Sequence, residues 1–169
     1  TVTHAVVITG TRAEVTAALV TADTLVVAAS AKVTISDGAG TAMTATDLSA
    51  IGAKTSGQVT VTNAVAITAA TLAEAKAALT TVDSLVVAAT ATLNITDDIA
   101  DASAANITDF NAVVDKTTGV ITATVTGIMA QLDNLTTGTT TTDQITVTVK
   151  DVADTALTAT QLSALGNKT

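Results

Sequence analysis

The residues of this chain that could bind a ligand are mainly aspartates at predicted strand-to-helix bends. They form three groups: Asp37 alone; Asp97, Asp98 and Asp101; and Asp151 with Asp154. Clustered carboxylate oxygens are preferred ligands of calcium. Asp97, Asp98 and Asp101 are therefore the candidate metal ligands, with calcium as the only cofactor considered.

A structural role is the competing interpretation of these aspartates. Asp favours turns and helix starts because its side chain accepts hydrogen bonds from nearby backbone amides. The sequence has neither a D-x-[DN]-x-[DN]-G loop nor the G-G-x-G-x-D repeat of calcium-binding solenoids.

Catalytic patterns are weak. His4 is the only histidine, its counterpart in the next repeat is Asn63, and cysteine is absent. A histidine base needs a nucleophile and an orienting partner. The glycines do not form a G-x-x-x-x-G-K-[ST] phosphate loop. We expect no enzymatic activity, no catalytic residue and no small-molecule substrate.

A repeat of about 60 residues organises the chain. Residues 33–37 return as 93–97, and residues 37–55 return as 151–169. The predicted repeats cover about 1–59, 60–119 and 120–169, the third shortened, within one continuous segment, 1–169. Each full repeat has two halves, each an extended Val/Thr segment followed by a short helix.

The strand composition predicts the fold class. Thr alternates with Val or Ile in runs such as 59–62 and 146–149, and there is no proline. Parallel strands would be joined by right-handed crossovers that contain the helices. We predict an α/β repeat fold, an elongated parallel β-solenoid with short helices between strand layers, in which Thr is exposed while Val and Ile point inward.

Helix boundaries are predicted from caps and stop signals. Glu14 and Glu74 lie in the first turn of one helix type. Thr46, Thr108 and Thr160 are the expected N-caps of the other type. The tails at 54–57 and 116–119, each with a Lys followed by a Gly, are typical helix stop signals. The Thr/Gly run 136–142 is the expected flexible loop.

Charge and hydropathy limit the partners. The net charge is −8, and such a chain repels nucleic acid and anionic membranes. No apolar run approaches the roughly 20 residues that span a bilayer, so we expect neither nucleic-acid binding nor membrane insertion.

The two ends of the sequence lie within the repeat pattern. Residues 1–9 match 60–68, and residues 166–169 match 52–55. We therefore expect either a window on a longer tandem protein or a unit whose ends stack. The expected partners are further repeats or other copies along the solenoid axis.

Residues 46–59, and Ile8-Thr9-Gly10-Thr11 followed by Ala13-Glu14-Val15, resemble a known family. They look like the tandem repeats of giant secreted cell-surface proteins of marine cyanobacteria and alphaproteobacteria, a family that includes swimming-associated surface proteins. The resemblance implies type I secretion, an extracellular place on the bacterial cell surface, and a structural, adhesive or motility role. It carries over no catalytic residue.

Two functions follow as hypotheses. The first is a non-catalytic extracellular structural module that forms a stalk, filament or surface layer by end-to-end or lateral packing. The alternative is an adhesin-type binding module whose face recognises a glycan, a calcium-dependent partner or ice. The Thr-x-Thr pairs 60/62, 122/124 and 146/148 are the feature that would suit ice.

Overall fold

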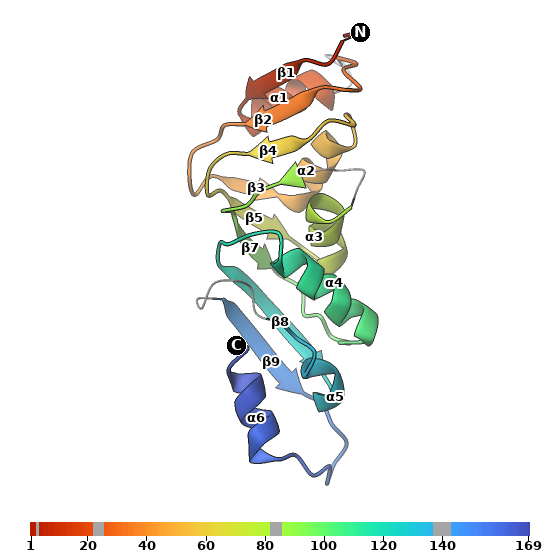
Figure 1. Ribbon diagram of the computed structural model, residues 1–169, viewed down its shortest axis with the longest axis vertical. Helices are drawn as coiled ribbons and strands as arrows, with labels where there is room; N and C mark the ends of the chain where they lie inside the picture. The colour runs from red at the N-terminus through yellow and green to blue at the C-terminus, as the bar shows by residue number, and fades with distance from the viewer. Residues whose placement is uncertain (3, 22–25, 82–85, 137–142) are drawn as a thin grey trace.

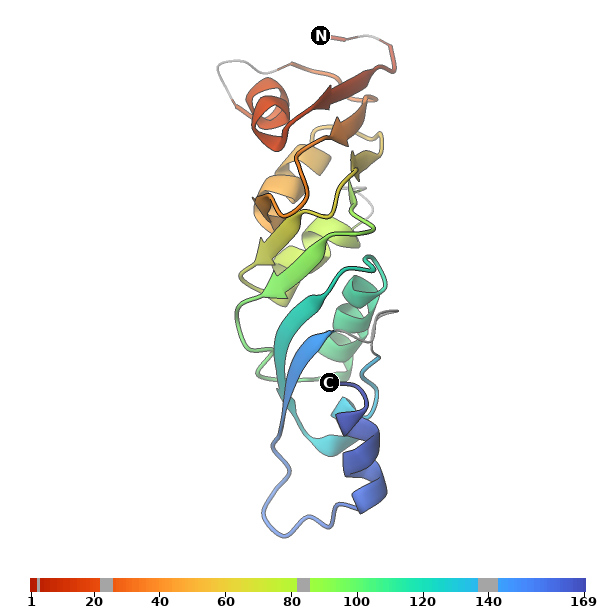
Figure 2. The ribbon, with the colours of Figure 1, turned by 90° about the vertical axis from the view of Figure 1, so that its left-hand side faces the viewer.

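The computed structural model describes residues 1–2, 4–21, 26–81, 86–136 and 143–169. The molecule is elongated, with the N-terminus at one end of the long axis and β9 and α6 at the other (Figures 1 and 2). In chain order the elements are β1 Val7–Gly10, α1 Arg12–Leu19, β2 Lys32–Ile35, β3 Ala42–Thr44, α2 Ala45–Gly52, β4 Val59–Val61, β5 Ala66–Ala69, α3 Leu72–Leu79, β6 Val86–Val87, β7 Thr92–Ile95, α4 Ala104–Val114, β8 Ile121–Gly127, α5 Met129–Leu132, β9 Gln144–Val149 and α6 Ala159–Gly166.

The strands form two parallel sheets. One has the order β1-β2-β4-β6, and the other has the order β3-β5-β7-β8-β9. Val33 lies opposite Val59 in the first sheet, and Ile67 lies opposite Leu93 in the second. Both sheets stay open over the described strands. The prediction of an α/β fold with parallel strands and short helices is confirmed.

The sequence period and the sheet period differ. Val33 and Leu93 are equivalent in the sequence repeat, yet β2 belongs to the four-stranded sheet and β7 to the five-stranded one. Neighbouring strands of one sheet are less than half a sequence period apart. Along the first sheet, the length of chain between a strand and the next helix therefore increases. Strand β1 ends at Gly10, almost directly before α1, whereas β3 lies between Ile35 of β2 and the start of α2.

The first four helices pack side by side along the long axis (Figure 2). Thr11 and Thr71 cap α1 and α3 by accepting hydrogen bonds from the backbone N–H groups of Glu14 and Glu74. These Thr side chains satisfy helix-terminal donors that have no partner inside the helix. Glu14 and Glu74 therefore lie in the first turns of their helices, as predicted.

The predicted N-caps of the other helix type are wrong. The caps of α2, α4 and α6 are Thr44, Ser103 and Thr158. Each accepts a hydrogen bond from the third residue of its helix, which is the cap geometry. Thr46 and Thr160 lie in the first turn instead, and the Thr108 hydroxyl donates to the Ala104 carbonyl inside α4.

The core is made of small and branched apolar side chains between the sheets and the helices. In β7, Leu93 and Ile95 are buried while Thr92 and Asn94 are exposed, and Phe110 of α4 is the largest fully buried side chain. The alternation predicted for the strands is confirmed there. Thr55, Thr117 and Thr126 are buried polar exceptions, and each has a specific hydrogen-bond partner.

Candidate functional site: the contacts between units and the two ends

A strand and the helix after it form one strand–helix unit, as in β1–α1, β3–α2 or β5–α3. Asp37 lies in the segment between β2 and β3 and contacts the β1–α1 unit, because its Oδ2 accepts a hydrogen bond of 2.5 Å from the backbone N–H of Arg12, the first residue of α1. Asp151 does the same for Met129, the first residue of α5, at 2.8 Å. A carboxylate at a helix N-terminus satisfies a free amide and is favoured by the helix dipole. These two aspartates have a structural role, but they connect distant segments of the chain and do not bond nearby backbone amides as the sequence predicted.

The three candidate calcium ligands have different surroundings. The carboxylate of Asp98 accepts from the Thr126 hydroxyl at 3.0 and 3.1 Å. The carbonyl of Asp101 accepts from Asn106 Nδ2 at 2.5 Å, and the N–H of Asp97 donates to the Ala70 carbonyl.

Asp97 and Asp98 also line an open cavity of about 240 Å³ at the start of α3. Across the ranges that the structure describes, no three His, Asp or Glu side chains are grouped so that they could hold a metal ion. Calcium binding by Asp97, Asp98 and Asp101 stays a prediction to which this geometry adds no support.

The tail after α2 makes a contact that the sequence did not reveal. The Thr55 hydroxyl donates to the Ala31 carbonyl at 2.5 Å and accepts from the Gly57 N–H at 3.0 Å. The Ser56 N–H donates to the Ala29 carbonyl at 2.7 Å. Residues 55–57 therefore fasten the end of α2 to the segment before β2, and we name them the first latch.

Residues 117–119 form a second latch after α4. The Thr117 hydroxyl donates to the Ala91 carbonyl at 2.5 Å and accepts from the Gly119 N–H at 3.0 Å. The Thr118 N–H donates to the Ala89 carbonyl at 2.8 Å. The two latches repeat the same bonds one sequence period apart.

The latch glycines are required by close approach. A Cβ on Gly57 would lie 2.1 Å from the Ala31 carbonyl oxygen, and a Cβ on Gly119 would lie 2.1 Å from the Ala91 oxygen. Sequence reasoning interpreted both glycines as helix stop signals, because a local pattern does not reveal a backbone partner far away in the chain. The one available signal was that Thr recurs two residues before Gly in both tails.

Ion pairs connect neighbouring helices at the surface. Arg12 pairs with Asp47 at 3.0 Å, and Lys76 pairs with Asp109 at 2.7 Å. Lys168, after α6, lies 3.9 Å from the carboxylate of Asp133 and also donates to its carbonyl. Exposed pairs of this kind contribute little individually, about 0–1 kcal/mol.

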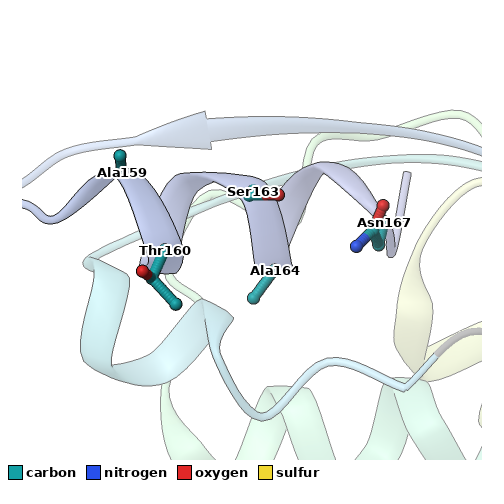
Figure 3. A pocket seen from close by; sticks show the side chains of 5 residues that line it. All are labelled: Ala159, Thr160, Ser163, Ala164 and Asn167. Carbon is teal, nitrogen blue, oxygen red and sulfur yellow. The ribbon is translucent and has the colours of Figure 1, made fainter.

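Helices α2 and α6 carry nearly the same sequence but have different surroundings. Leu48 of α2 is 0 % exposed, whereas its counterpart Leu162 in α6 is 49 % exposed. Ala45 is buried and its counterpart Ala159 is exposed. Along α6 runs an open hollow of about 470 Å³ (Figure 3), whose lining residues are Ala159, Thr160, Ser163, Ala164 and Asn167.

The same turn precedes both helices. Gly40 has φ 75°, and Asp154, its counterpart, has φ 65°. The Thr41 N–H donates to the Gly38 carbonyl, as the Thr155 N–H donates to the Val152 carbonyl. A left-handed conformation costs a residue other than glycine roughly 1–2 kcal/mol. The chain thus forms this turn in the last repeat even without glycine.

After this turn the two copies diverge. Residues 42–44 form β3 and pair with β5, whereas the counterpart residues 156–158 are not in a strand. At the opposite end, β1 has β2 as its one neighbour among the described strands, while its sequence counterpart β5 lies between β3 and β7. Val7 of β1 is 69 % exposed.

Threonines of the Thr-x-Thr pairs lie in rows across the sheets, but the pairs are out of register: Thr122 lies opposite Gln144, and Thr124 lies opposite Thr146. Thr9, Thr34 and Thr60 are adjacent in one row, which ends at Val87. A second row runs through Thr44, Thr68, Asn94, Thr122 and Gln144. Residues of other types interrupt both hydroxyl rows, so this arrangement does not specifically support ice binding.

His4 is exposed and lies ahead of β1. None of the helices in the described ranges has the length and apolar character needed to span a bilayer.

Comparison of the chain with protein-family models, curated proteins and solved structures found no match.

Proposed function

We propose that the chain is a non-catalytic structural repeat module, an elongated parallel β-solenoid that extends a stalk, filament or surface layer by end-to-end packing. The observation that carries this proposal is the contrast between α2 and α6. Leu48 is fully buried inside the molecule, while the same position in the last repeat, Leu162, is half exposed.

The contacts between units support a role based on length. The latches and the aspartate contacts at the starts of α1 and α5 connect nearby segments of the chain. In repeat proteins, stability is approximately a sum of units and nearest-neighbour interfaces. A chain built in this way can be lengthened by adding units without redesigning its core.

The composition of the ends supports end-to-end contact. Terminal units of soluble repeat proteins normally present a polar outer face. Here Val7 is 69 % exposed at one end, and Val152 and Leu162 are 81 % and 49 % exposed at the other. Apolar side chains at both ends favour covering by a further unit.

The proposed location is extracellular, on a bacterial cell surface. This part of the proposal is supported by the resemblance of residues 46–59 to repeats of secreted surface proteins. The absence of cysteine and the net charge of −8 are compatible with such a place.

Sedimentation velocity from micromolar to millimolar concentration tests the proposal, with electron microscopy of the concentrated sample. We expect the sedimentation coefficient to rise with concentration and elongated particles to appear. Leu162→Glu should reduce association, because it places a charge on a face that the next copy covers. Val87→Glu, at a valine 39 % exposed and away from both ends, is the matched control.

Each outcome decides between structural alternatives. A wild-type chain that stays monomeric at millimolar concentration contradicts the proposed function. Association that Val87→Glu abolishes and Leu162→Glu leaves intact would replace end-to-end packing with lateral packing.

A further inference from the structure

We propose a specific joint for the end-to-end contact: residues 156–158 of one copy pair in parallel with β1 of a second copy, on the edge where β1 has no neighbour among the described strands, and α1 of that second copy packs against α6. This inference rests on the proposed function and names its partner, a second copy of this chain. The pattern for the joint is present inside the molecule.

Inside the chain, the β3–α2 unit is covered by the β5–α3 unit. Residues Ala42, Met43 and Thr44 of β3 lie opposite Ala66, Ile67 and Thr68 of β5 in a parallel ladder. Helix α2 packs closely along α3. These contacts accompany the complete burial of Leu48.

Both partners of this internal interface recur at the ends of the described chain. Residues 151–169 repeat 37–55, so the last repeat carries the β3–α2 sequence. Residues 1–9 repeat 60–68, so β1 carries the β5 sequence. Helix α1 follows β1 as α3 follows β5, with the same Thr cap and an acidic residue at the third helical position. Each end therefore has the sequence that would cover the other.

The unpaired strand edges match as well. Strand β5 has neighbours on both sides, β3 and β7. Among the described strands, β1 has only β2, which is the counterpart of β7. By this pattern, the segment that fits the other edge of β1 is the counterpart of β3, namely residues 156–158. An unpaired strand edge is a ready template for another chain.

The internal ladder fixes the register of the joint. Ala156 should lie opposite Val7, Leu157 opposite Ile8, and Thr158 opposite Thr9. The turn at Asp154 already has the conformation of the turn at Gly40. The turn that leads into residues 156–158 is thus already formed before association, which lowers the entropic cost of binding.

The helices complete the same arrangement. Helix α3 packs against α2 on one side and against α4 on the other. Helix α1, the counterpart of α3, packs against α2, which is the counterpart of α4. Its remaining side corresponds to the side of α3 that covers α2. On α6 the matching surface includes Leu162, which is half exposed while its counterpart Leu48 is buried in the interior. Because β1 and α6 lie at opposite ends of the molecule (Figures 1 and 2), a second copy provides the partner.

Cysteine cross-linking tests the joint, because the chain has no cysteine of its own. The variants Val7→Cys and Ala156→Cys are mixed at millimolar concentration and oxidised mildly. Neighbouring strands lie roughly 4.8 Å apart, within the Cα separation that a disulfide spans. We expect a heterodimer as the main cross-linked product, and a ladder of longer oligomers from the double variant Val7→Cys/Ala156→Cys.

Two controls use the internal copy. The double variant Ala42→Cys/Ala66→Cys has the same register pair within one chain and should form an intramolecular disulfide. A mixture of Val7→Cys with Ala42→Cys should give no heterodimer, because β5 already pairs with β3. Leu162→Glu should lower the heterodimer yield by about tenfold, a change of 1.4 kcal/mol in association.

The outcomes separate this joint from the proposed function. Oligomers in sedimentation without a disulfide between positions 7 and 156 would overturn the joint and leave the structural function standing. A heterodimer of equal yield from the mismatched pair would also overturn the joint. Chains that neither associate nor cross-link would overturn both proposals.

Discussion

Helices α2 and α6 show that the burial of a helix in this molecule depends on the elements next to it. Their sequences differ at few positions, and both begin at a Thr cap after the same turn. Nevertheless Leu48 is buried and Leu162 is half exposed. Full burial of a leucine side chain contributes about 1.5–3 kcal/mol. That stabilisation therefore depends on the elements packed around the helix and not on the sequence of the helix.

The contrast is greatest for the leucine pair. Leu48→Ala should lower the free energy of unfolding by about 2–5 kcal/mol, because it leaves a cavity in the core. Leu162→Ala should cost the separate chain about 1 kcal/mol or less, since half of the side chain is already in water. Urea unfolding of dilute samples measures both values. Equal losses for the two variants would show that α6 is packed as α2 is.

The latch glycine gives the next largest effect. Gly57→Ala should destabilise the fold by about 1–3 kcal/mol or more, because the new Cβ would meet the Ala31 carbonyl oxygen. Gly166→Ala is the control: it has open space around it and ends α6, so it should be neutral or stabilise by at most about 0.5 kcal/mol. Thermal unfolding followed by circular dichroism distinguishes these signs. A neutral Gly57→Ala would contradict the close approach in the first latch.

Loss of the latch hydroxyl should cost as much as the latch glycine substitution or less. Thr55→Val keeps the shape of the side chain but leaves the Ala31 carbonyl and the Gly57 N–H without the Thr55 hydroxyl, at a cost of about 1–3 kcal/mol. Thr169→Val, at the exposed counterpart, should change stability by under about 0.5 kcal/mol. Chemical denaturation of both variants measures the difference. If the two variants unfold at the same midpoint, the hydroxyl bond does not stabilise the latch.

The smallest expected effect is a pH dependence of the α1 cap. The backbone N–H and then the hydroxyl of Thr11 lower the pKa of Glu14 from 4.5. A lowered pKa gives stabilisation that is present above the unfolded-state pKa and is lost as the pH falls through the folded-state pKa. Gln161 occupies the same capping position in α6 and does not titrate.

An NMR titration of the backbone amides tests this difference. The Thr11 amide should shift with a midpoint below 4.5, and the Glu14→Gln variant should lose that transition. The Thr158 amide, which donates to Gln161, should show no such transition of its own. A Thr11 midpoint at or above 4.5 would contradict the capping geometry.

The sequence was sufficient for the features that depend on local alternation. Residue periodicity predicts buried Val and Ile, exposed Thr, parallel strands and short helices. In β7, for example, Leu93 is buried and Asn94 is exposed. The sheet to which each strand belongs did not follow. Val33 and Leu93 are equivalent in sequence, but their sheet is decided by the length of chain between neighbouring strands, which differs from half the repeat.

Features that depend on distant partners were also missed. The aspartates at 37 and 151 looked like potential ligands, but their carboxylates satisfy helix amides of earlier segments. Gly57 looked like a stop signal because its contact with Ala31 is not local. Of the predicted Thr/Gly loop at 136–142, only Thr136 lies within the described residues. The family resemblance and the cell-surface location stay predictions.

Hydrogen exchange at residues 156–158, compared with residues 42–44, tests the central claim most directly. The amide of Met43 should be protected at every concentration, because the ladder in which the Ala66 N–H donates to the Thr41 carbonyl directs the Met43 N–H toward β5. Its counterpart, the amide of Leu157, should exchange fast in dilute samples and become protected at millimolar concentration, as a second copy adds its β1. Exchange at 156–158 that stays fast at all concentrations, while particles grow, would contradict the claim that the ends join as the interior does.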